Sequence, residues 1–182
     1  MKDIQDESTW PVWANEKIEI VDSDPNWVLK GAQEKARLLA LLSSFGINEI
    51  QHYGSTSIPN LPAKPIIDLM TKVDTFKQIE ELASILESDG WNYVPPHLDG
   101  RTWQRFFVKV VNNKRVAHLH ILIEGDERWD KHILFRDLLR NNQQFIEDYA
   151  ILKRSLAKKY NNDREAYTKA KNEFITYVLD TN

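Results

Sequence analysis

Residues 51–70, with the sequence QHYGSTSIPNLPAKPIIDLM, decide the fold of this chain. A short run typical of a strand ends in Gly-Ser-Thr-Ser at 54–57, a loop with three prolines follows, and an apolar run then carries one acid, Asp68. Backbone N–H groups in such a turn can approach a phosphate closely, because Gly54 has no Cβ to hold the ligand away. A carboxylate on the next strand can hold a magnesium ion against that phosphate. The segment therefore predicts two strands joined by a turn that suits phosphate binding.

Outside this segment, apolar spacing and turn residues predict further strands and helices. Asp24 and Pro25 are typical of a helix start, Gly46 is typical of a helix end, and Asn112-Asn113 is typical of a β-hairpin turn. Strands are predicted at 17–21, 47–53, 65–71, 91–94, 103–111 and 115–123, and helices at 24–43, 74–87, 128–140, 143–160 and 164–179. Because strands precede helices in blocks, we expect an α+β fold with a small mixed β-sheet flanked by helices and a helical C-terminal part.

Length and composition fit one globular domain. The 182 residues are enough for a substantial core, and 42% apolar with 28% charged residues is ordinary for a globular chain. The net charge of −3 gives no reason to expect nucleic-acid or membrane binding. The absence of cysteine excludes disulfides, thiol nucleophiles and thiolate zinc sites, and it suits a reducing compartment. We therefore expect a cytoplasmic protein without a membrane span.

The two ends of the chain carry weaker signals. The polar start of the chain is not typical of a secretory signal, and we expect residues 1–17 to be an N-terminal extension before a single domain at 18–182. In that extension, Trp10, Pro11 and Trp13 indicate either a short arm packed on the body or a mobile tail. Near the other end, the basic cluster Lys153, Arg154, Lys158 and Lys159 is interpreted as a solvated helix face.

A second chemical signal is the pair His118 and His120 in a predicted strand. Side chains two residues apart in a strand point to the same side, with Cα atoms roughly 6.6 Å apart. The pair can bind one metal ion or bracket one anion, or it can consist of hydrogen-bonded sheet residues. If Asp68 lies beside the pair, the three side chains together suit a transition metal better than magnesium.

A third chemical signal is a set of basic residues. His132, Arg136 and Arg140 recur every four residues, so they share one face of a helix. Arg136 lies between apolar residues and is either turned inward toward an anion or paired with a neighbouring acid, whereas the other two are interpreted as solvated. Lys64, on the return of the loop, and Arg105, on the strand expected to pair with the histidine strand, are further candidates for anion binding.

Four stretches of the chain resemble the GrpB family, over about residues 18–178: YGSTSIPNLPAKPIIDL at 53–69, WQRFFVK at 103–109, AHLHIL at 117–122 and the helical run at 130–175. The resemblance implies a nucleotidyltransferase-like fold, in which a small mixed sheet is flanked by helices. The biochemical role of the family is poorly defined, so the resemblance implies a fold more than a reaction.

The chain departs from the broader nucleotidyltransferase pattern at one position and from the usual loop of the GrpB family at another. That pattern has Gly-Ser before a strand with two acids one residue apart; here Gly54-Ser55 and Asp68 match, but Met70 takes the second acid position. A thioether cannot replace a hard oxygen ligand, so Asp68 can share at most one ion with substrate phosphates. Asn60 takes a position where the family more usually has glycine, and asparagine tolerates a positive φ there.

These observations support three functional hypotheses. The first is nucleotidyl transfer to a small acceptor, with catalytic and metal-binding roles for Asp68, His118 and His120. The second is a binding module that holds a nucleotide or phosphorylated metabolite without turning it over, and the third is a metal-dependent phosphohydrolase. We expect a small phosphorylated ligand rather than nucleic acid, and one divalent ion, magnesium or manganese ahead of zinc, without an organic cofactor. The predicted phosphate-binding residues are Gly54, Ser55, Thr56, Ser57, Lys64, Arg105 and Arg136.

Overall fold

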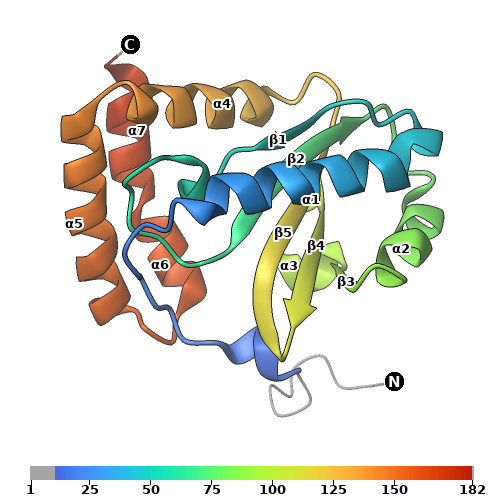
Figure 1. The fold of residues 1–182 in the computed structure, drawn as a ribbon, viewed down its shortest axis with the longest axis horizontal. Coiled ribbons are helices and arrows are strands. Elements are labelled where there is room, and N and C mark those ends of the chain that lie inside the picture. Colours follow the sequence, from blue (N-terminus) through green and yellow to red (C-terminus); the bar gives the residue numbers. More distant parts are fainter. Residues whose placement is uncertain (1–10, 182) are drawn as a thin grey trace.

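The computed structural model describes residues 11–181, which form a five-stranded mixed sheet packed with helices (Figure 1). The strands are β1 Ile50–His52, β2 Ile67–Val73, β3 Trp91–Val94, β4 Gln104–Val111 and β5 Lys114–Ile123. They lie in the order β1-β2-β5-β4-β3, and β2 runs parallel to β5 while the other neighbouring strands pair antiparallel. The predicted α+β fold with a small mixed sheet is thus confirmed.

The helices begin and end near residues that favour such ends. The helices are α1 Asn26–Leu42, α2 Ile79–Glu87, α3 Pro96–Asp99, α4 Glu127–Arg140, α5 Gln143–Lys159, α6 Arg164–Ala170 and α7 Asn172–Asp180, with 3-10 turns η2 Val12–Asn15, η3 Ser43–Phe45 and η4 Ser55–Ser57. The Asp24 carboxylate accepts the Asn26 N–H at 2.9 Å before α1, as its sequence predicts. Gly46 follows η3 with a φ of 74°, a left-handed conformation that suits glycine.

One face of the sheet is covered by α1 and α2 and holds the main core (Figure 1). Leu38 and Leu42 of α1 and Leu86 of α2 are fully buried against the sheet. The sheet contributes the alternating positions of its central strands, among them Leu69, Phe107, Leu119 and Ile121. The residues between these positions, including Asp68 and the two histidines, therefore point to the opposite face.

The opposite face of the sheet is overlaid by the helical C-terminal part. In Figure 1, α4, α5, α6 and α7 stand together on the side away from α2. Trp129 of α4 packs on Met70 and Leu122 of the sheet, and a separate cluster joins α4, α5 and α7 to the loop after η4. The predicted helical C-terminal part is confirmed, and it leaves room for a cavity over the sheet.

Three predicted elements differ from the structure. The segment 17–21 is no strand: only Val21 bridges Ala63, and the Ile18 N–H instead donates to Asn161 O. The predicted helix at 74–87 begins only at Ile79, because β2 extends to Val73 and a turn follows it. The predicted helix at 164–179 is divided into α6 and α7 by a break at Lys171. Residues 17–21 therefore pack on the loop between α5 and α6 rather than in the sheet.

Two turns confirm expectations about asparagine. Asn112 and Asn113 join β4 to β5 with φ angles of 51° and 59°, and positive φ at both central residues is the pattern of a type I′ hairpin. Asn60 has a φ of 63°, so this position does require the left-handed conformation for which the resemblance suggested glycine.

Part of the N-terminal extension lies against the body of the protein. The Arg115 guanidinium lies 5.1 Å from the centre of the Trp13 ring, and it donates to the carbonyl oxygens of Trp13 and Ala14. The prediction of a packed arm is thus confirmed at Trp13, whereas Trp10 lies outside the described residues.

Candidate functional site

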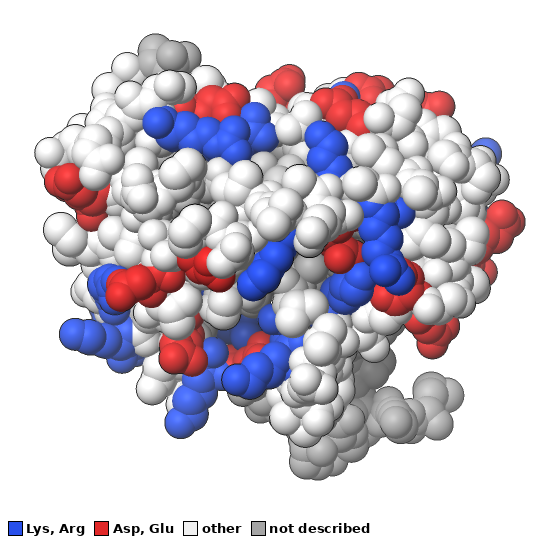
Figure 2. All heavy atoms as spheres, in the orientation of Figure 1, with Lys and Arg blue, Asp and Glu red and all other residues white. Residues whose placement is uncertain are grey.

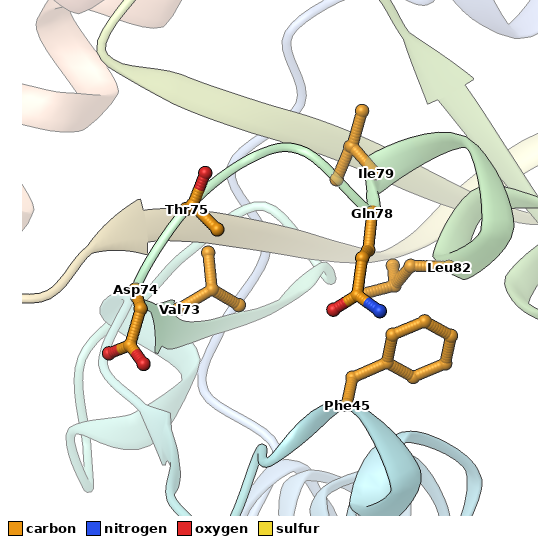
Figure 3. A pocket seen from close by; sticks show the side chains of 7 residues that line it. All are labelled: Phe45, Val73, Asp74, Thr75, Gln78, Ile79 and Leu82. Carbon is orange, nitrogen blue, oxygen red and sulfur yellow. The ribbon is translucent and has the colours of Figure 1, made fainter.

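A large cavity lies between the sheet and the helical C-terminal part. Its volume is about 1830 Å³, and its walls include the Gly54–Ser55 turn, Asp68 of β2 and both histidines of β5. A second cavity of about 110 Å³ lies between η3 and the start of α2, and Figure 3 shows its lining. Its one ionisable side chain, Asp74, stands at the side away from Phe45. The large cavity is therefore the candidate site.

The pairing of β2 with β5 brings Asp68, His118 and His120 together. Asp68 lies opposite His118 in the parallel register, and Met70 lies opposite His120, so all four side chains share one face. His118 Nδ1 lies 2.9 Å from Asp68 Oδ1. One potential ligand atom from each of Asp68, His118 and His120 lies within 4.8 Å of the others. The three side chains form a group that can hold one metal ion.

A hydrogen-bond chain behind His120 fixes the state of its ring. The Gln104 Nε2 donates to Asp99 Oδ2 at 2.7 Å, which turns Gln104 Oε1 toward His120 Nδ1 at 2.9 Å. Because an amide oxygen only accepts, His120 Nδ1 carries the proton and Nε2 keeps a lone pair. Sequence reasoning missed Gln104 and Asp99, since their roles depend on cross-strand contacts.

His118 also keeps a lone pair that no group in the described residues uses. Its Nδ1 donates to the ionised Asp68, so Nε2 is unprotonated. Within residues 11–181, His118 Nε2 is buried and has no hydrogen-bond partner. A buried nitrogen without a partner is unfavourable, and a ligand at this atom would relieve it.

Burial and charge set the protonation of the group. Burial raises the pKa of the Asp68 carboxyl, but the hydrogen bond from His118 and nearby positive charges outweigh it, so the pKa lies well below its usual range. Burial lowers the pKa of His118 although Asp68 opposes this, and it lowers the pKa of His120 to about 3. At neutral pH the site holds a carboxylate and two neutral imidazoles, the states that metal ligands need.

The Gly-Ser turn packs directly against Asp68. A methyl group at Gly54 would lie 2.5 Å from Asp68 Cβ and 2.7 Å from its Cγ, closer than side-chain atoms can stand. Glycine is thus required here by close approach to Asp68. Gly54 and Ser55 line the cavity.

The other two hydroxyl residues of the turn hold its shape. Thr56 is buried, donates to Ile66 O at 2.9 Å and lies 2.9 Å from His52 Nε2. Ser57 is also buried and donates to Gly54 O at 2.7 Å. Their side chains support the turn from behind, so the part of the predicted phosphate loop that lines the cavity is Gly54 and Ser55.

The predicted basic residues lie in three different places. Lys64 lines the cavity. Arg136 ties α4 to β1, because it donates to Gln51 Oε1 at 3.0 Å and His52 O at 3.3 Å, and it also pairs with Asp137. Arg105 lies on the α2 face of the sheet, where its guanidinium stands 3.9 Å from the centre of the Phe76 ring. The structure brings only Lys64 of these three to the cavity.

Several residues of the cavity wall were interpreted as solvated from the sequence, or were not singled out there. The solvated interpretation of Lys153 is wrong: its side chain is buried, and its ammonium donates to Pro62 O. His132 lines the cavity with its ring 4.8 Å from that of Tyr53, whereas Arg140 donates to Ser57 O. Further cationic side chains on the wall are Arg101, Arg115, Arg128, Lys131, Arg164 and Lys171.

None of the helices in residues 11–181 combines the length and apolar character needed to cross a membrane.

Comparisons with known proteins agree with the resemblance seen in the sequence. The UPF0157 protein YqkA of Bacillus subtilis is 34% identical over 168 residues, which are 92% of this chain and 48% of that protein. The chain therefore spans about half the length of this curated relative.

Solved structures support the fold. The crystal structure of the conserved protein GrpB from Enterococcus faecalis matches with a TM-score of 0.77 and 29% identity, over 90% of this chain and 96% of that one. The Cid1 poly(U) polymerase, solved with MgATP, matches with a TM-score of 0.50 and 13% identity over 78% of this chain and 44% of that one, a likeness of fold alone. A family model described as GrpB protein matches residues 17–181, and the chain therefore belongs to the GrpB family.

Proposed function

We propose that this chain binds a nucleotide or another phosphorylated small molecule together with one divalent metal ion, and transfers a nucleotidyl group to a small acceptor. The observation that carries the proposal is the convergence of Asp68, His118 and His120 on a cavity wall beside the Gly54–Ser55 turn. Cationic side chains on the same wall favour a ligand rich in phosphate. The nucleotidyltransferase-like fold is the reason for choosing this transfer first.

The donor atoms fit a divalent ion. Asp68 is ionised, and His120 Nε2 has a free lone pair. His118 can bind the ion in one of two ways: through Nδ1 beside Asp68, once the hydrogen bond between them is given up, or through Nε2, with Asp68 as its hydrogen-bonded support. Two imidazoles and one carboxylate suit manganese better than magnesium, with zinc as the main competitor. When bound, the ion would supply positive charge that polarises phosphate oxygens.

The chain offers ligands for one ion rather than two. Met70, which shares the face of Asp68, is fully buried, and its thioether is a poor ligand for magnesium or manganese. Lys64 on the cavity wall would neutralise phosphate charge. If the ion is held by Asp68, one of the two histidines and phosphate oxygens, the other histidine would accept the proton of the attacking hydroxyl group. The oxygen of that group would bond to the α-phosphorus of the nucleoside triphosphate as pyrophosphate leaves.

The first test is binding. Equilibrium dialysis of the metal-free protein with manganese, zinc or magnesium should give one bound manganese or zinc ion and a weaker magnesium site. Calorimetry with nucleoside triphosphates in the presence of manganese should then give one nucleotide per chain. If neither the ions nor any nucleotide with ion binds, the proposal is wrong.

A second candidate function is metal-dependent hydrolysis of a phosphorylated ligand. It is favoured by Met70, because a single ion held by one carboxylate and two imidazoles can activate a water molecule. Mass spectrometry of reactions with nucleotides separates the possibilities: a nucleotidylated acceptor indicates transfer, free phosphate or nucleoside monophosphate without an acceptor adduct indicates hydrolysis, and unchanged bound nucleotide indicates a non-catalytic binding module.

Replacing Gln104 with leucine should weaken metal binding about tenfold, because the His120 ring loses the hydrogen bond that fixes its tautomer and orientation. Equilibrium dialysis with manganese measures this effect. The matched control is Gln78→Leu, the same change at an exposed residue of the small cavity in Figure 3. Equal manganese affinity of Gln104→Leu and wild type would show that the hydrogen-bond chain has no such role.

A further inference from the structure

Three lysines from distant parts of the chain, of which Lys153 is buried while Lys64 and Lys171 are half-buried, meet on one wall of the large cavity. Lys64 follows η4, Lys153 belongs to α5, and Lys171 lies at the break between α6 and α7. The Nζ atoms of Lys64 and Lys171 lie 5.4 Å and 4.7 Å from the centre of the same Tyr167 ring. The Lys153 Nζ lies 4.8 Å from the centre of the Tyr149 ring. The aromatic rings stabilise these ammonium groups only in part.

Two arginines add to this positive wall. Arg115 at the start of β5 and Arg164 at the start of α6 both line the cavity, where their guanidinium groups bind backbone carbonyl oxygens, and Arg164 also pairs with Glu16. In Figure 2, lysine and arginine atoms border a hollow below the centre of the visible face. The chain as a whole is negative, so this local excess of cations is a specific feature of the cavity.

Within residues 11–181, the three lysines have no carboxylate partner. In the described part of the chain, no acidic oxygen lies within 4.0 Å of the ammonium groups of Lys64, Lys153 or Lys171. The other lysine of the cavity and three of its four arginines do have such a partner: Lys131, Arg101, Arg128 and Arg164. A buried charge without a partner is unfavourable, and like charges close together add repulsion. A multiply charged anion at this wall would remove both penalties.

We propose that this wall is a subsite for a chain of at least two phosphate groups, such as the diphosphate or triphosphate of a nucleotide; the inference rests on the proposed function for the rest of that ligand. The three lysines come from three separate parts of the chain and lie beside two different aromatic rings. A single phosphate can therefore contact only part of this wall. A linear polyphosphate can contact Lys64 and Lys171 across Tyr167 and extend toward Lys153. Asp68 lines the same cavity, and the reacting phosphate would meet the ion there.

Binding at this wall should weaken as the pH rises. Burial lowers the pKa of Lys64 to about 7 and that of Lys171 to about 8, so Lys64 loses its charge around pH 7 and Lys171 around pH 8. Asp68 opposes both shifts, while Arg115, Arg164 and Lys171 repel Lys64, and Arg101 repels Lys171. Because the anion binds the protonated lysines, the affinity for polyphosphate should be highest below pH 7 and fall through this range.

The experiment uses inorganic phosphates and the full chain. Calorimetry at pH 6.5 in metal-free buffer should show tripolyphosphate binding more tightly than pyrophosphate and far more tightly than orthophosphate. Lys171→Met should weaken tripolyphosphate binding at least about tenfold, because one charge-assisted contact is lost. Lys169→Met removes the same charge from an exposed position of α6 and should leave binding unchanged. Lys64→Met is an independent second variant with the same expected loss.

The outcomes separate this inference from the proposed function. Tripolyphosphate binding that is absent, no tighter than orthophosphate binding, or equal in wild type and both variants would overturn the subsite, even if manganese binds. Conversely, lysine-dependent tripolyphosphate binding by a protein that takes up no metal would support the subsite and reject the metal site. Thermal unfolding checks the fold: Lys171→Met should melt no lower than wild type, since it removes a half-buried charge that has no carboxylate partner within the described residues.

Discussion

Asp68→Asn is expected to reduce manganese affinity more than about 100-fold, a larger loss than the removal of a supporting residue produces. Asp68 is the carboxylate of the three-residue group, and its neutral amide replacement is a weaker ligand for a divalent ion. The change also weakens the hydrogen bond that sets the tautomer of His118. Nucleotide binding that depends on manganese should disappear with the ion, and equilibrium dialysis followed by calorimetry measures both.

Asp74→Asn is the matched control for this variant. Asp74 follows β2 directly and is exposed, so the control removes the same charge from a place outside the large cavity. Metal binding by Asp74→Asn should equal that of wild type. Tripolyphosphate binding without metal should persist or tighten in Asp68→Asn, because the variant loses a negative charge beside the lysine wall. Undiminished manganese binding in Asp68→Asn would mean that the ion, if any, lies elsewhere.

The sequence predicts the parts of this fold that depend on local pattern. Alternation in 115–123 places His118 and His120 on one face, and Asn112-Asn113 predicts the hairpin before them; both features are present. The register that sets Asp68 beside His118 is different, because it joins strands separated by two others along the chain. Neither strand alone contains that information, so the meeting of Asp68 with the histidines was a hypothesis until the pairing was known.

The wall formed by Lys64, Lys153 and Lys171 could not be predicted from local sequence pattern. Lys153 belongs to a run of basic residues on an amphipathic helix, and such a run usually faces solvent. Here α5 packs across the loop after η4, which turns Lys153 inward to Pro62 O. Lys171 enters the cavity region where α6 ends and α7 begins, and no break was predicted there. Tertiary packing, rather than the type of residue, thus decides which lysines serve the cavity.

Gly54→Ala is expected to abolish metal binding as fully as the loss of Asp68 itself. The new methyl group would lie 2.5 Å from Asp68 Cβ, and Cβ is fixed to the backbone of β2, so rotation of the side chain cannot relieve the overlap. Either the turn or the strand must shift, and the Asp68 contact with His118 is lost with it. Overpacking of this kind destabilises proteins by about 1–3 kcal/mol. Urea unfolding and manganese dialysis should therefore both change.

Ser55→Ala tests whether the loss of metal binding in Gly54→Ala comes from the overlap with Asp68. Ser55 is the next residue of the turn and also lines the cavity, but its side chain makes no hydrogen bond within the described residues. Its replacement should leave the stability and the manganese affinity close to those of wild type. If Gly54→Ala instead binds manganese normally and only unfolds more easily, the turn supports the fold without positioning Asp68. Loss of binding at urea concentrations where Gly54→Ala is still folded would tie the close approach of turn and carboxylate to the metal site.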